Sequence, residues 1–473
     1  MPQYDAVVVG SGPNGLAAAI LLARNNHRVL VVESKDTVGG GTRTAELTLP
    51  GFKHDICSAI HPLGLASPFF RMLPLNEFGL EWIEPPAPLA HPLDDGTVVM
   101  LERSIEETSA NLGPDAKTYH KLMRPMVRNW EGLSQDILGP LPLPPRHPII
   151  LSRFGLMALR SARGLASSRF SGERAKALFA GISAHSILPL ERPVSAAIGL
   201  VLATLGHAVG WPIPVGGSQH IADSLAAYFK SIGGEIHLNK KVESLDEFSE
   251  ETVLLLDVTP RQVLRMSDGQ LPESYKRSLA KYRYGPGAFK VDWALSGPIP
   301  WRASECARAG TVHVGGKLEE IAAAEASVWR GEVPERPYVL LAQPSLFDST
   351  RAPAGQHTAW AYCHVPNGSS VDMTSRIEAQ VERFASGFRD CILARNVINA
   401  PGMEAYNSNY IGGDINGGVQ DLWQLFTRPV ARWVPYSTPN KRIFICSSST
   451  PPGGGVHGMC GYHAAKAVLR SLA

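Results

Sequence analysis

The fold is decided by Ala6-Val-Val-Val-Gly-Ser-Gly-Pro-Asn-Gly-Leu-Ala-Ala-Ala-Ile20, in which an apolar strand, a glycine-rich turn and an alanine-rich helix follow one another without a gap. Gly10 allows the tight turn, Gly12 lets the backbone approach a pyrophosphate, and Gly15 lets the helix and the strand pack closely. In such a turn the phosphates face the helix N-terminus. The stretch therefore predicts the first half of a dinucleotide-binding βαβ unit.

The second strand of this unit is predicted at Arg28-Val-Leu-Val-Val-Glu33, and it ends in a carboxylate. Glu33 follows the last glycine of the motif by 18 positions, close to the interval of about 20 at which an acid meets a ribose hydroxyl. An acid at this place disfavours a 2′-phosphate. The glycine motif alone does not separate FAD from NAD.

A second glycine cluster follows in Glu33-Ser-Lys-Asp-Thr-Val-Gly-Gly-Gly-Thr-Arg43, where an NAD dehydrogenase would usually carry its next helix. With this cluster the chain resembles the FAD-dependent phytoene desaturase-like and flavin amine oxidase-like superfamily. The distant segment Arg442-Ile-Phe-Ile-Cys-Ser-Ser-Ser-Thr-Pro-Pro-Gly-Gly-Gly-Val-His-Gly-Met-Cys-Gly-Tyr-His-Ala-Ala465 is similar to that family's closing strand, flavin-contacting turn and final helix. Two motifs at opposite ends of the chain thus indicate the same family.

Segments between these motifs extend the resemblance over almost the whole chain. Val215-Gly-Gly-Ser-Gln-His-Ile-Ala-Asp-Ser-Leu225 looks like the family's central helix, and Gly233-Gly-Glu-Ile-His-Leu-Asn-Lys-Lys-Val-Glu243 looks like the strand whose valine touches the adenine. The resemblance is strongest to the branch grouped with pyridine nucleotide-disulfide oxidoreductase domain-containing protein 2. The 6 cysteines contain no C-x-x-C pair, and no second G-x-G-x-x-G follows a strand. We therefore expect neither disulfide reductase chemistry nor a separate NADPH domain.

The resemblance implies an α/β fold with a discontinuous, glutathione reductase-like Rossmann-type FAD-binding domain and an inserted α+β substrate-binding domain. The length of 473 residues agrees with two domains, because single cores stop growing at about 250 to 300 residues. The FAD-binding domain is predicted at residues 1–65, 213–292 and 400–473, and the substrate-binding domain at residues 66–212 and 293–399. Apparent strands at 289–295, 338–343 and 357–364 predict an antiparallel sheet that forms one wall of the substrate site.

The resemblance also implies the contacts of the cofactor. No Cys or His lies in a recognisable flavin-linking motif, so we expect FAD to be bound without a covalent bond. The residues expected to hold it are Gly10, Gly12, Pro13, Asn14, Gly15, Glu33, Ser34, Gly40, Gly41, Thr42, Arg43, Val242, Gly455, Val456, His457 and Met459.

Three side chains are candidates for catalysis beside the flavin. Lys290 begins a strand at the position where flavin amine oxidases carry a lysine near N5, and a partly desolvated lysine can bind a water or activate oxygen. Asp292 would share its face of the strand by the two-residue period and could pair with it. His457 could donate a hydrogen bond or take a proton. The alternatives are a solvated strand end for Lys290 and a plain turn residue for His457.

Other residues are weaker candidates. Asp55, Ser58 and His61 lie where the family chain passes the flavin, and Ser218 is expected to cap the helix that begins at Gln219. An amine oxidase would need an aromatic cage, for which the chain offers several residues that core packing also explains. These are Tyr406, Tyr410, Trp423, Phe426 and Trp433.

The chain departs from the amine oxidases at two places. Gly41 stands where many of them have an arginine after the glycine pair, and Ser447-Ser-Ser449 stands where many have a Gly-Asp or Gly-Glu. The second departure removes an acidic contact to the flavin ribitol or phosphate and fits the desaturase-like branch better. We therefore predict an enzyme that dehydrogenates an apolar or amphipathic substrate, forming a C=C bond by hydride transfer to flavin N5, with oxygen or a quinone as acceptor. The alternatives are a flavin amine oxidase, a polyene isomerase that needs reduced FAD without net redox change, and a non-enzymatic flavoprotein.

Composition limits the partners and the location. A net charge of +2 and the lack of a basic run argue against nucleic-acid binding. The 15 dispersed histidines show no metal-ligand spacing, so no metal site is predicted.

Scattered cysteines without a disulfide framework and the lack of a leader pattern predict a cytoplasmic setting. The basic and apolar segment 146–176 is interpreted as a pair of helices that cap the substrate cavity, with a peripheral membrane contact as the alternative. The oligomeric state is left open.

Overall fold

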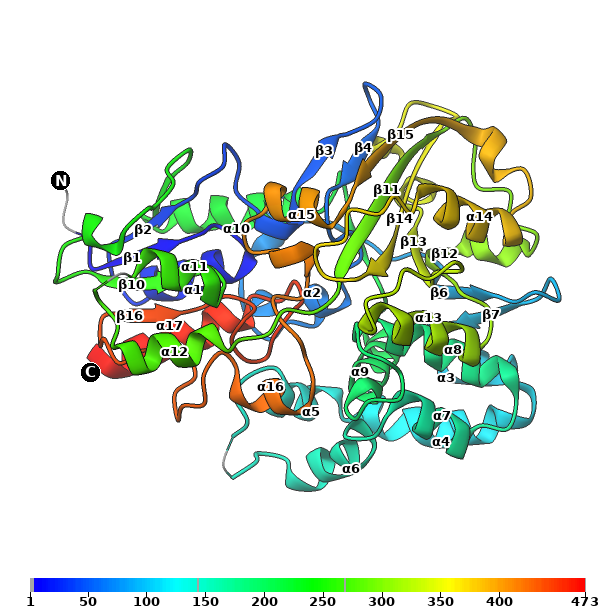
Figure 1. Cartoon of the computed structure of the whole chain (residues 1–473), viewed down its shortest axis with the longest axis horizontal. Helices are drawn as coiled ribbons and strands as arrows, with labels where there is room; N and C mark the ends of the chain where they lie inside the picture. The colour runs from blue at the N-terminus through cyan, green and yellow to red at the C-terminus, as the bar shows by residue number, and fades with distance from the viewer. Residues whose placement is uncertain (1–3, 143, 268, 473) are drawn as a thin grey trace.

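The computed structural model describes residues 4–142, 144–267 and 269–472 and contains two large sheets that lie next to each other along its long axis (Figure 1). The smaller sheet has five parallel strands in the order β16-β10-β1-β2-β9. Its strands are β1 (Ala6–Val9), β2 (Val29–Val32), β9 (Glu235–His237), β10 (Val253–Leu256) and β16 (Ile443–Ile445). The apolar runs of β1, β2 and β16 are buried throughout, as parallel strands covered on both faces require.

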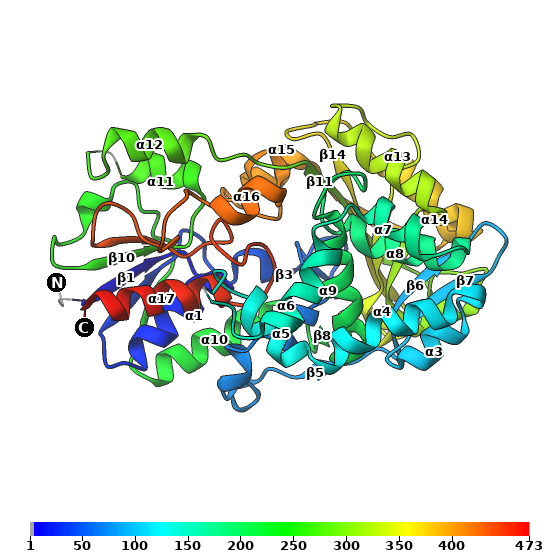
Figure 2. The ribbon, with the colours of Figure 1, turned by 90° about the horizontal axis from the view of Figure 1, so that it is seen from below.

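Helices cover both faces of this parallel sheet. On one face α1 (Pro13–Ala23) packs against α17 (Met459–Leu472) and α10 (Gln219–Ser231). On the other face lie α11 (Pro260–Met266) and α12 (Glu273–Ala280). The two ends of the described chain therefore meet in one Rossmann-type unit, in which the first and the last helix are neighbours (Figure 2).

The larger sheet has seven strands in the order β15-β11-β14-β13-β12-β6-β7. They are β6 (Ala87–Pro92), β7 (Val98–Leu101), β11 (Gly287–Leu295), β12 (Ala309–Val314), β13 (Val339–Ala342), β14 (His357–Val365) and β15 (Ile392–Ile398). All neighbours are antiparallel except β12 and β6. The predicted antiparallel strands are thus present as β11, β13 and β14, and the predicted α/β fold class is confirmed.

The two faces of the larger sheet have different surroundings. Val291, Val312 and Leu341 point to one face and pack in a cluster with residues of α14 (Thr374–Phe384). The other face looks toward α13 (Leu318–Trp329) and a layer of helices between residues 105 and 208 (Figure 2). This layer consists of α3 (Ile105–Ala110), α4 (Ala116–Arg128), α5 (Trp130–Ile137), α6 (Pro148–Ala158), α7 (Ala162–Arg169), α8 (Glu173–Ala184) and α9 (Ser195–Ala208).

Short elements connect these layers. They are β3 (Thr44–Glu46) paired with β4 (Lys53–Asp55), β5 (Trp82–Ile83) paired with β8 (Ile213–Pro214), and the helices α2 (Pro62–Ala66), α15 (Ala400–Tyr406) and α16 (Leu422–Thr427). The strands of the parallel sheet come from all three segments predicted for the nucleotide domain. β11, however, continues past the predicted boundary at residue 292 and pairs along its whole length with β14. Residues 1–3, 143, 268 and 473 of the predicted domains lie outside the described residues.

The basic segment 146–176 forms α6, α7 and the first turn of α8 instead of one pair of helices. α6 and α7 pack on α9, and α6 exposes Ile149 and Leu156 to solvent. Neither α6 nor α7 contributes a residue to the two cavities described below. These helices therefore cap neither of these cavities, since they pack on α9, whose Leu202 lines the second cavity. Within the described part of the chain, no helix combines the length and apolarity needed to cross a bilayer.

Candidate functional site

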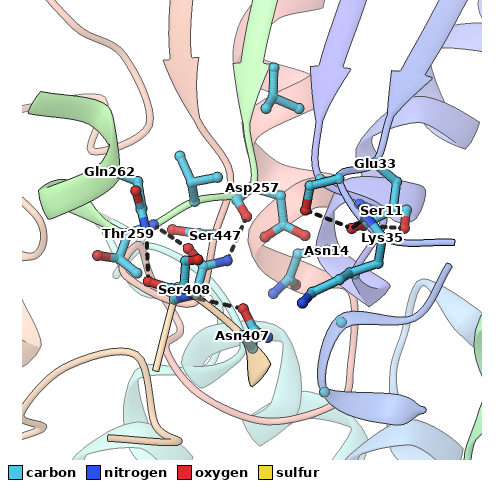
Figure 3. Close-up of a pocket in the computed structure, with 18 of the residues that line it drawn as sticks. Ser11, Asn14, Glu33, Lys35, Asp257, Thr259, Gln262, Asn407, Ser408 and Ser447 are labelled. Carbon is cyan, nitrogen blue, oxygen red and sulfur yellow. Dashed lines mark hydrogen bonds between the residues drawn. The ribbon is translucent and has the colours of Figure 1, made fainter. Parts of the chain in front are cut away.

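A first cavity, termed here the nucleotide cavity, opens at the carboxyl ends of β1, β2 and β10 (Figure 3). Crevices at this edge of a parallel sheet are the usual ligand sites of doubly wound folds. Most of the residues predicted to hold the cofactor are brought together in its lining. These are Gly10, Gly12, Pro13, Asn14, Glu33, Ser34, Gly40, Gly41, Arg43 and Val242.

The glycines leave room that side chains would fill. A Cβ on Gly12 would lie 2.8 Å from Oδ2 of Asp257, and a Cβ on Gly40 would lie 3.1 Å from Cα of Gly12. A Cβ on Gly15 would clash with the carbonyl oxygen of Gly10. The turn after β1, the start of α1 and the second glycine cluster therefore approach one another closely, and a polar cradle remains between them.

Glu33 is held at the end of β2 by its neighbours in this cradle. Its Oε2 accepts hydrogen bonds from the backbone N–H of Ser11 at 3.0 Å and from the Ser11 hydroxyl at 2.6 Å. Its Oε1 accepts one from the N–H of Lys35 at 3.0 Å and lies 3.4 Å from Nη2 of Arg43. The carboxylate is thus oriented and charge-balanced at the place where the sequence puts the ribose contact.

Asp257 is a cavity residue that the sequence interpretation missed. It follows β10 as Glu33 follows β2, and its Oδ2 accepts a hydrogen bond of 3.0 Å from the N–H of Gly15 in the first turn of α1. Burial and the nearby Glu33 raise the pKa of Asp257 well above its ordinary value. The signal that could have found it is an acid directly after the apolar run Val253-Leu-Leu-Leu256.

Further lining residues come from the segment after α15 and from the turn after β16. The Tyr406 hydroxyl donates to the carbonyl oxygen of Gly40 at 3.2 Å, and a Cβ on Gly41 would clash with the Tyr410 hydroxyl. Tyr410 thus stands where a side chain at position 41 would have to pass. The other polar lining residues that the sequence interpretation missed are Ser11, Lys35, Lys240, Lys241, Thr259, Gln262, Asn407, Ser408, Asn409, Ser447, Ser448 and Ser449.

A second cavity, termed here the sheet cavity, adjoins the nucleotide cavity and reaches the larger sheet. The two cavities share Pro13, Asn14, Gly41, Tyr410, Ile415 and Ser448. Thr42, Gly455 and Val456, which were predicted to contact the cofactor, line the sheet cavity, as do Ser58 and His61. Among the described residues that line it, none carries a charged side chain.

The register of the larger sheet builds one wall of this cavity. Thr311, Ala342 and Trp360 are direct cross-strand neighbours on β12, β13 and β14, and His313, Leu340 and Tyr362 form the next row on the same face. All of these except His313 line the sheet cavity. Trp211, Leu202 and His185 complete the wall from the helical layer. The cavity is therefore apolar and aromatic with a few neutral polar groups.

Lys290 and Asp292 continue the same two rows on β11, opposite Tyr362 and Trp360. Both are buried and paired with each other, and Lys290 Nζ lies 5.3 Å from the centre of the Trp360 ring. Burial raises the pKa of Asp292, while Lys290 opposes that shift. Neither residue lines either cavity. The pair lies one strand beyond Trp360 and Tyr362, and its catalytic role stays a prediction. The lysine is not a solvated strand end.

His457 is buried in the C-terminal turn. Its Nδ1 accepts a hydrogen bond of 3.0 Å from the N–H of Met459, and burial lowers its pKa to about 4. Its carbonyl oxygen accepts from the Ser67 hydroxyl at 2.6 Å. His457, Met459 and Gly15 do not line the cavities. The imidazole therefore positions the turn that carries Gly455 and Val456.

Two weaker candidates have structural partners. Asp55 is buried against Arg351 at 2.5 Å and accepts from the N–H of Ser218 at 2.7 Å. The Ser218 hydroxyl donates to the carbonyl of Ser58 at 2.6 Å and makes no side-chain cap of α10. Ser218 thus stands at the N-cap position of α10 as predicted, but its side chain makes no capping bond, because the hydroxyl holds the loop that lines the sheet cavity.

The aromatic residues considered for a cage do not form one. Trp423 and Trp433 are 76% and 91% exposed, and Phe426 is exposed as well. Because these three side chains are exposed, packing in the core does not explain them either. Tyr406 and Tyr410 line the nucleotide cavity, whereas the aromatic lining of the sheet cavity comes mainly from Trp211, Trp360 and Tyr362. Their grouping depends on strand register, which the sequence did not reveal.

Comparison with known proteins agrees with this architecture. Residues 8–73 match the family model of the NAD(P)-binding Rossmann-like domain. The whole chain is 26% identical to pyridine nucleotide-disulfide oxidoreductase domain-containing protein 2 of Mus musculus, over 94% of that protein. It is also 26% identical to the phytoene desaturase (neurosporene-forming) of Rhodobacter capsulatus, over 96% of this chain and 92% of that protein.

The fold is also that of a solved amine oxidase. Cyclohexylamine oxidase from Brevibacterium oxydans IH-35A superposes with a TM-score of 0.61 at 15% identity, over 100% of both chains. The similarities in sequence and in fold confirm the predicted resemblance and the predicted arrangement of a Rossmann-type domain with a substrate-binding domain.

Proposed function

We propose that this oxidoreductase, similar over its whole length to the phytoene desaturase-like and flavin amine oxidase-like superfamily, binds FAD without a covalent bond and dehydrogenates an apolar or amphipathic substrate to form a C=C bond. FAD would lie in the nucleotide cavity and the substrate in the sheet cavity. Electrons would leave to oxygen or a quinone.

The observation that carries this proposal is the junction of two unlike cavities. The nucleotide cavity holds oriented carboxylates and backbone N–H groups at a helix N-terminus, which suit a ribose and a pyrophosphate. The adjoining sheet cavity is apolar and aromatic, and no charged side chain of the described residues lines it. A molecule with a charged nucleotide end and a flat ring end would span both.

The residues of the nucleotide cavity fit FAD in their chemistry. Glu33 offers an oriented carboxylate to a ribose, and Gly12 and Gly40 leave the space that phosphates need. Oδ1 of Asn14 is buried without a hydrogen-bond partner among the described residues and lines both cavities, as expected of an atom whose partner is a ligand. When bound, FAD supplies a ring that accepts a hydride equivalent from carbon.

The protein itself would bind and orient the substrate and exclude water from it. Trp360, Tyr362 and Trp211 give a rigid apolar wall, which favours a substrate held by its hydrocarbon part. An amine arrives as an ammonium ion at neutral pH, and burying it without a carboxylate is costly. The uncharged lining therefore supports the desaturation proposal over the amine oxidase alternative.

The test starts with the visible absorption spectrum of the purified protein, followed by denaturation and identification of the released cofactor. We expect flavin bands and free FAD. Release of NAD, or a colourless protein that does not take up added FAD, would contradict the proposal.

The reaction is then tested without oxygen, by adding isoprenoid hydrocarbons and alcohols to the FAD-loaded protein. Bleaching of the flavin bands together with a new C=C bond in the product is the expected result. Product formation that needs reduced FAD but consumes no acceptor would identify the isomerase alternative, and bleaching by amines alone would identify the amine oxidase.

A further inference from the structure

Two hydrogen-bond donors of the sheet cavity have no acceptor. The Thr311 hydroxyl and the Trp360 indole N–H are both buried and lack a partner among the described residues. Both side chains line the sheet cavity, and their positions on β12 and β14 flank Ala342 in one cross-strand row. A buried donor without an acceptor is destabilising, so these two groups point to a ligand atom that accepts hydrogen bonds.

A third donor follows from a pair of histidines beside this row. His185 lines the cavity, and its Nε2 lies 2.9 Å from Nε2 of His313, whose Nδ1 is buried without a partner. Burial lowers the pKa of both imidazoles, that of His185 to about 3, so both are neutral. One of the two Nε2 atoms therefore carries the shared hydrogen and donates it, and the other accepts.

The bare Nδ1 of His313 decides where that hydrogen lies. If His185 donated, His313 would carry an N–H at Nδ1 with no acceptor, and orphaned buried N–H groups are rarer than under-used acceptors. His313 thus donates from Nε2, and His185 carries its own hydrogen on Nδ1. That ring nitrogen has no other partner among the described residues, which leaves it for a ligand in the cavity.

We propose that Thr311, Trp360 and His185 form an oxygen-binding subsite that selects apolar substrates carrying one neutral hydroxyl or carbonyl oxygen. The inference rests on the proposed function in one respect, namely that the sheet cavity is the substrate cavity. It specifies the substrate class further: a mostly hydrocarbon molecule whose single oxygen accepts hydrogen bonds, not an amine and not a plain hydrocarbon.

One acceptor in the same cavity limits the chemistry further. The Ser218 hydroxyl donates to Ser58, so His61 must donate from Nε2 to Ser218 at 2.8 Å. Its Nδ1, buried without a partner, is then a bare acceptor in the cavity lining. A hydroxyl oxygen can use this acceptor as well as the donors, whereas a carbonyl uses only the donors.

The experiment measures the binding of four molecules of one shape to the FAD-loaded protein by calorimetry. Ethylbenzene carries no oxygen, acetophenone a carbonyl, 1-phenylethanol a hydroxyl and 1-phenylethylamine an ammonium. We expect both oxygen compounds to bind about fivefold or more tightly than ethylbenzene, the gain of a satisfied hydrogen bond, and the amine to bind more weakly than either. Equal binding of acetophenone and ethylbenzene, or tightest binding of the amine, would overturn the subsite.

Matched variants separate the subsite from a merely structural role. Thr311→Val should lower acetophenone affinity about fivefold and leave ethylbenzene unchanged. Thr358→Val is the control, because Thr358 on β14 also has a buried hydroxyl without a partner but does not line the cavity. His185→Phe should lower acetophenone affinity similarly, whereas His120→Phe, at a surface position on α4, should not.

Failure of this inference is distinguishable from failure of the proposed function. If the protein binds no FAD, quenching of the fluorescence of cavity tryptophans by the same four compounds still reports the subsite. If FAD binds but the oxygen compounds gain nothing over ethylbenzene, the subsite is wrong and the proposed cofactor stands.

Discussion

The nucleotide cavity and the sheet cavity meet at Asn14 and Gly41 but are built in opposite ways. The nucleotide cavity takes much of its lining from one continuous stretch of chain, and its carboxylates are fixed by backbone N–H groups of the adjacent turn. The sheet cavity takes its lining from strands and helices far apart in sequence. Local motif chemistry thus builds the first, and cross-strand register builds the second.

Charged side chains are also placed differently in the two regions. In the nucleotide cavity Glu33 and Asp257 face the space where a ligand would lie. Beside the sheet cavity, Lys290 is paired to Asp292 on the neighbouring strand, and neither residue lines the cavity. A charged cofactor end and an uncharged substrate can therefore lie within one continuous space.

The largest effect is expected from removing the buried cation of Lys290 beside the sheet cavity. Lys290→Met leaves the buried Asp292 carboxylate with only Asn396, at 3.3 Å, and the neutral His54 nearby. Removing one partner of a buried ion pair costs about 3 to 5 kcal/mol. We expect urea denaturation to show a loss of stability of that size with the FAD content unchanged.

The double variant Lys290→Met/Asp292→Asn is the control for this prediction. It removes both charges, so most of the lost stability should return. Its rate of anaerobic flavin reduction by substrate tests the predicted catalytic role of the pair. If that role is right, the rate falls tenfold or more, since about 1.4 kcal/mol of lost transition-state stabilisation already gives a tenfold fall, whereas a rate within about threefold of the wild type would leave the pair a structural role alone.

The next largest effect concerns the tight helix approach at the nucleotide cavity. A Cβ on Gly15 would clash with the Gly10 carbonyl, so Gly15→Ala must displace the turn itself. Overpacking of this kind costs about 3 kcal/mol, and FAD binding should be lost with it. Gly155→Ala is the matched control, because Gly155 lies in α6 with nothing near its missing Cβ. That variant should gain about 0.5 to 1 kcal/mol. Similar unfolding midpoints for both variants would contradict the packing argument.

The same contrast explains how much the sequence could predict. The fold class, the strand ends and Glu33 were predictable because the motif places them within one short stretch whose geometry is set by glycine and a helix N-terminus. Asp257 was within reach, since it ends a buried strand in the same manner. The grouping of Thr311 and Trp360 was not predictable. It depends on the register of β12 and β14 against β13, which no sequence pattern specifies. The burial of Lys290 likewise depends on packing from other elements.

A smaller effect is expected from neutralising Glu33, the carboxylate predicted to contact a ribose. Glu33→Gln keeps an oxygen for the Ser11 N–H but loses the negative charge that faces the Arg43 guanidinium and the Lys35 backbone N–H. Hydrogen bonds to charged groups exceed neutral ones by about 1 kcal/mol. FAD affinity, measured by fluorescence titration, should therefore fall about fivefold to tenfold. The exposed Glu46 on β3 provides the control variant Glu46→Gln, which should bind FAD like the wild type. Equal affinity of Glu33→Gln would remove the carboxylate from the nucleotide site.

The smallest effect is a pH dependence that originates at Asp257. Its pKa in the folded protein lies well above the ordinary value of 3.8 because of burial and the neighbouring Glu33. A raised folded pKa gives stability that is fully present below the unfolded pKa and is lost as the pH rises toward the folded pKa. Asp257→Asn keeps an acceptor for the Gly15 N–H and cannot ionise.

We therefore expect the stability of the wild type to fall relative to Asp257→Asn as the pH rises above 3.8, with a constant difference at lower pH. Urea denaturation of both proteins across this range measures the difference, and the exposed Asp36 supplies a control in Asp36→Asn. A difference that shrinks with rising pH would mean that the folded protein favours the ionised carboxylate. In that case the Asp257 carboxylate would already balance the partial positive charge at the N-terminus of α1 before any phosphate binds. The nucleotide cavity would then hold anions less well than its glycine motif implies.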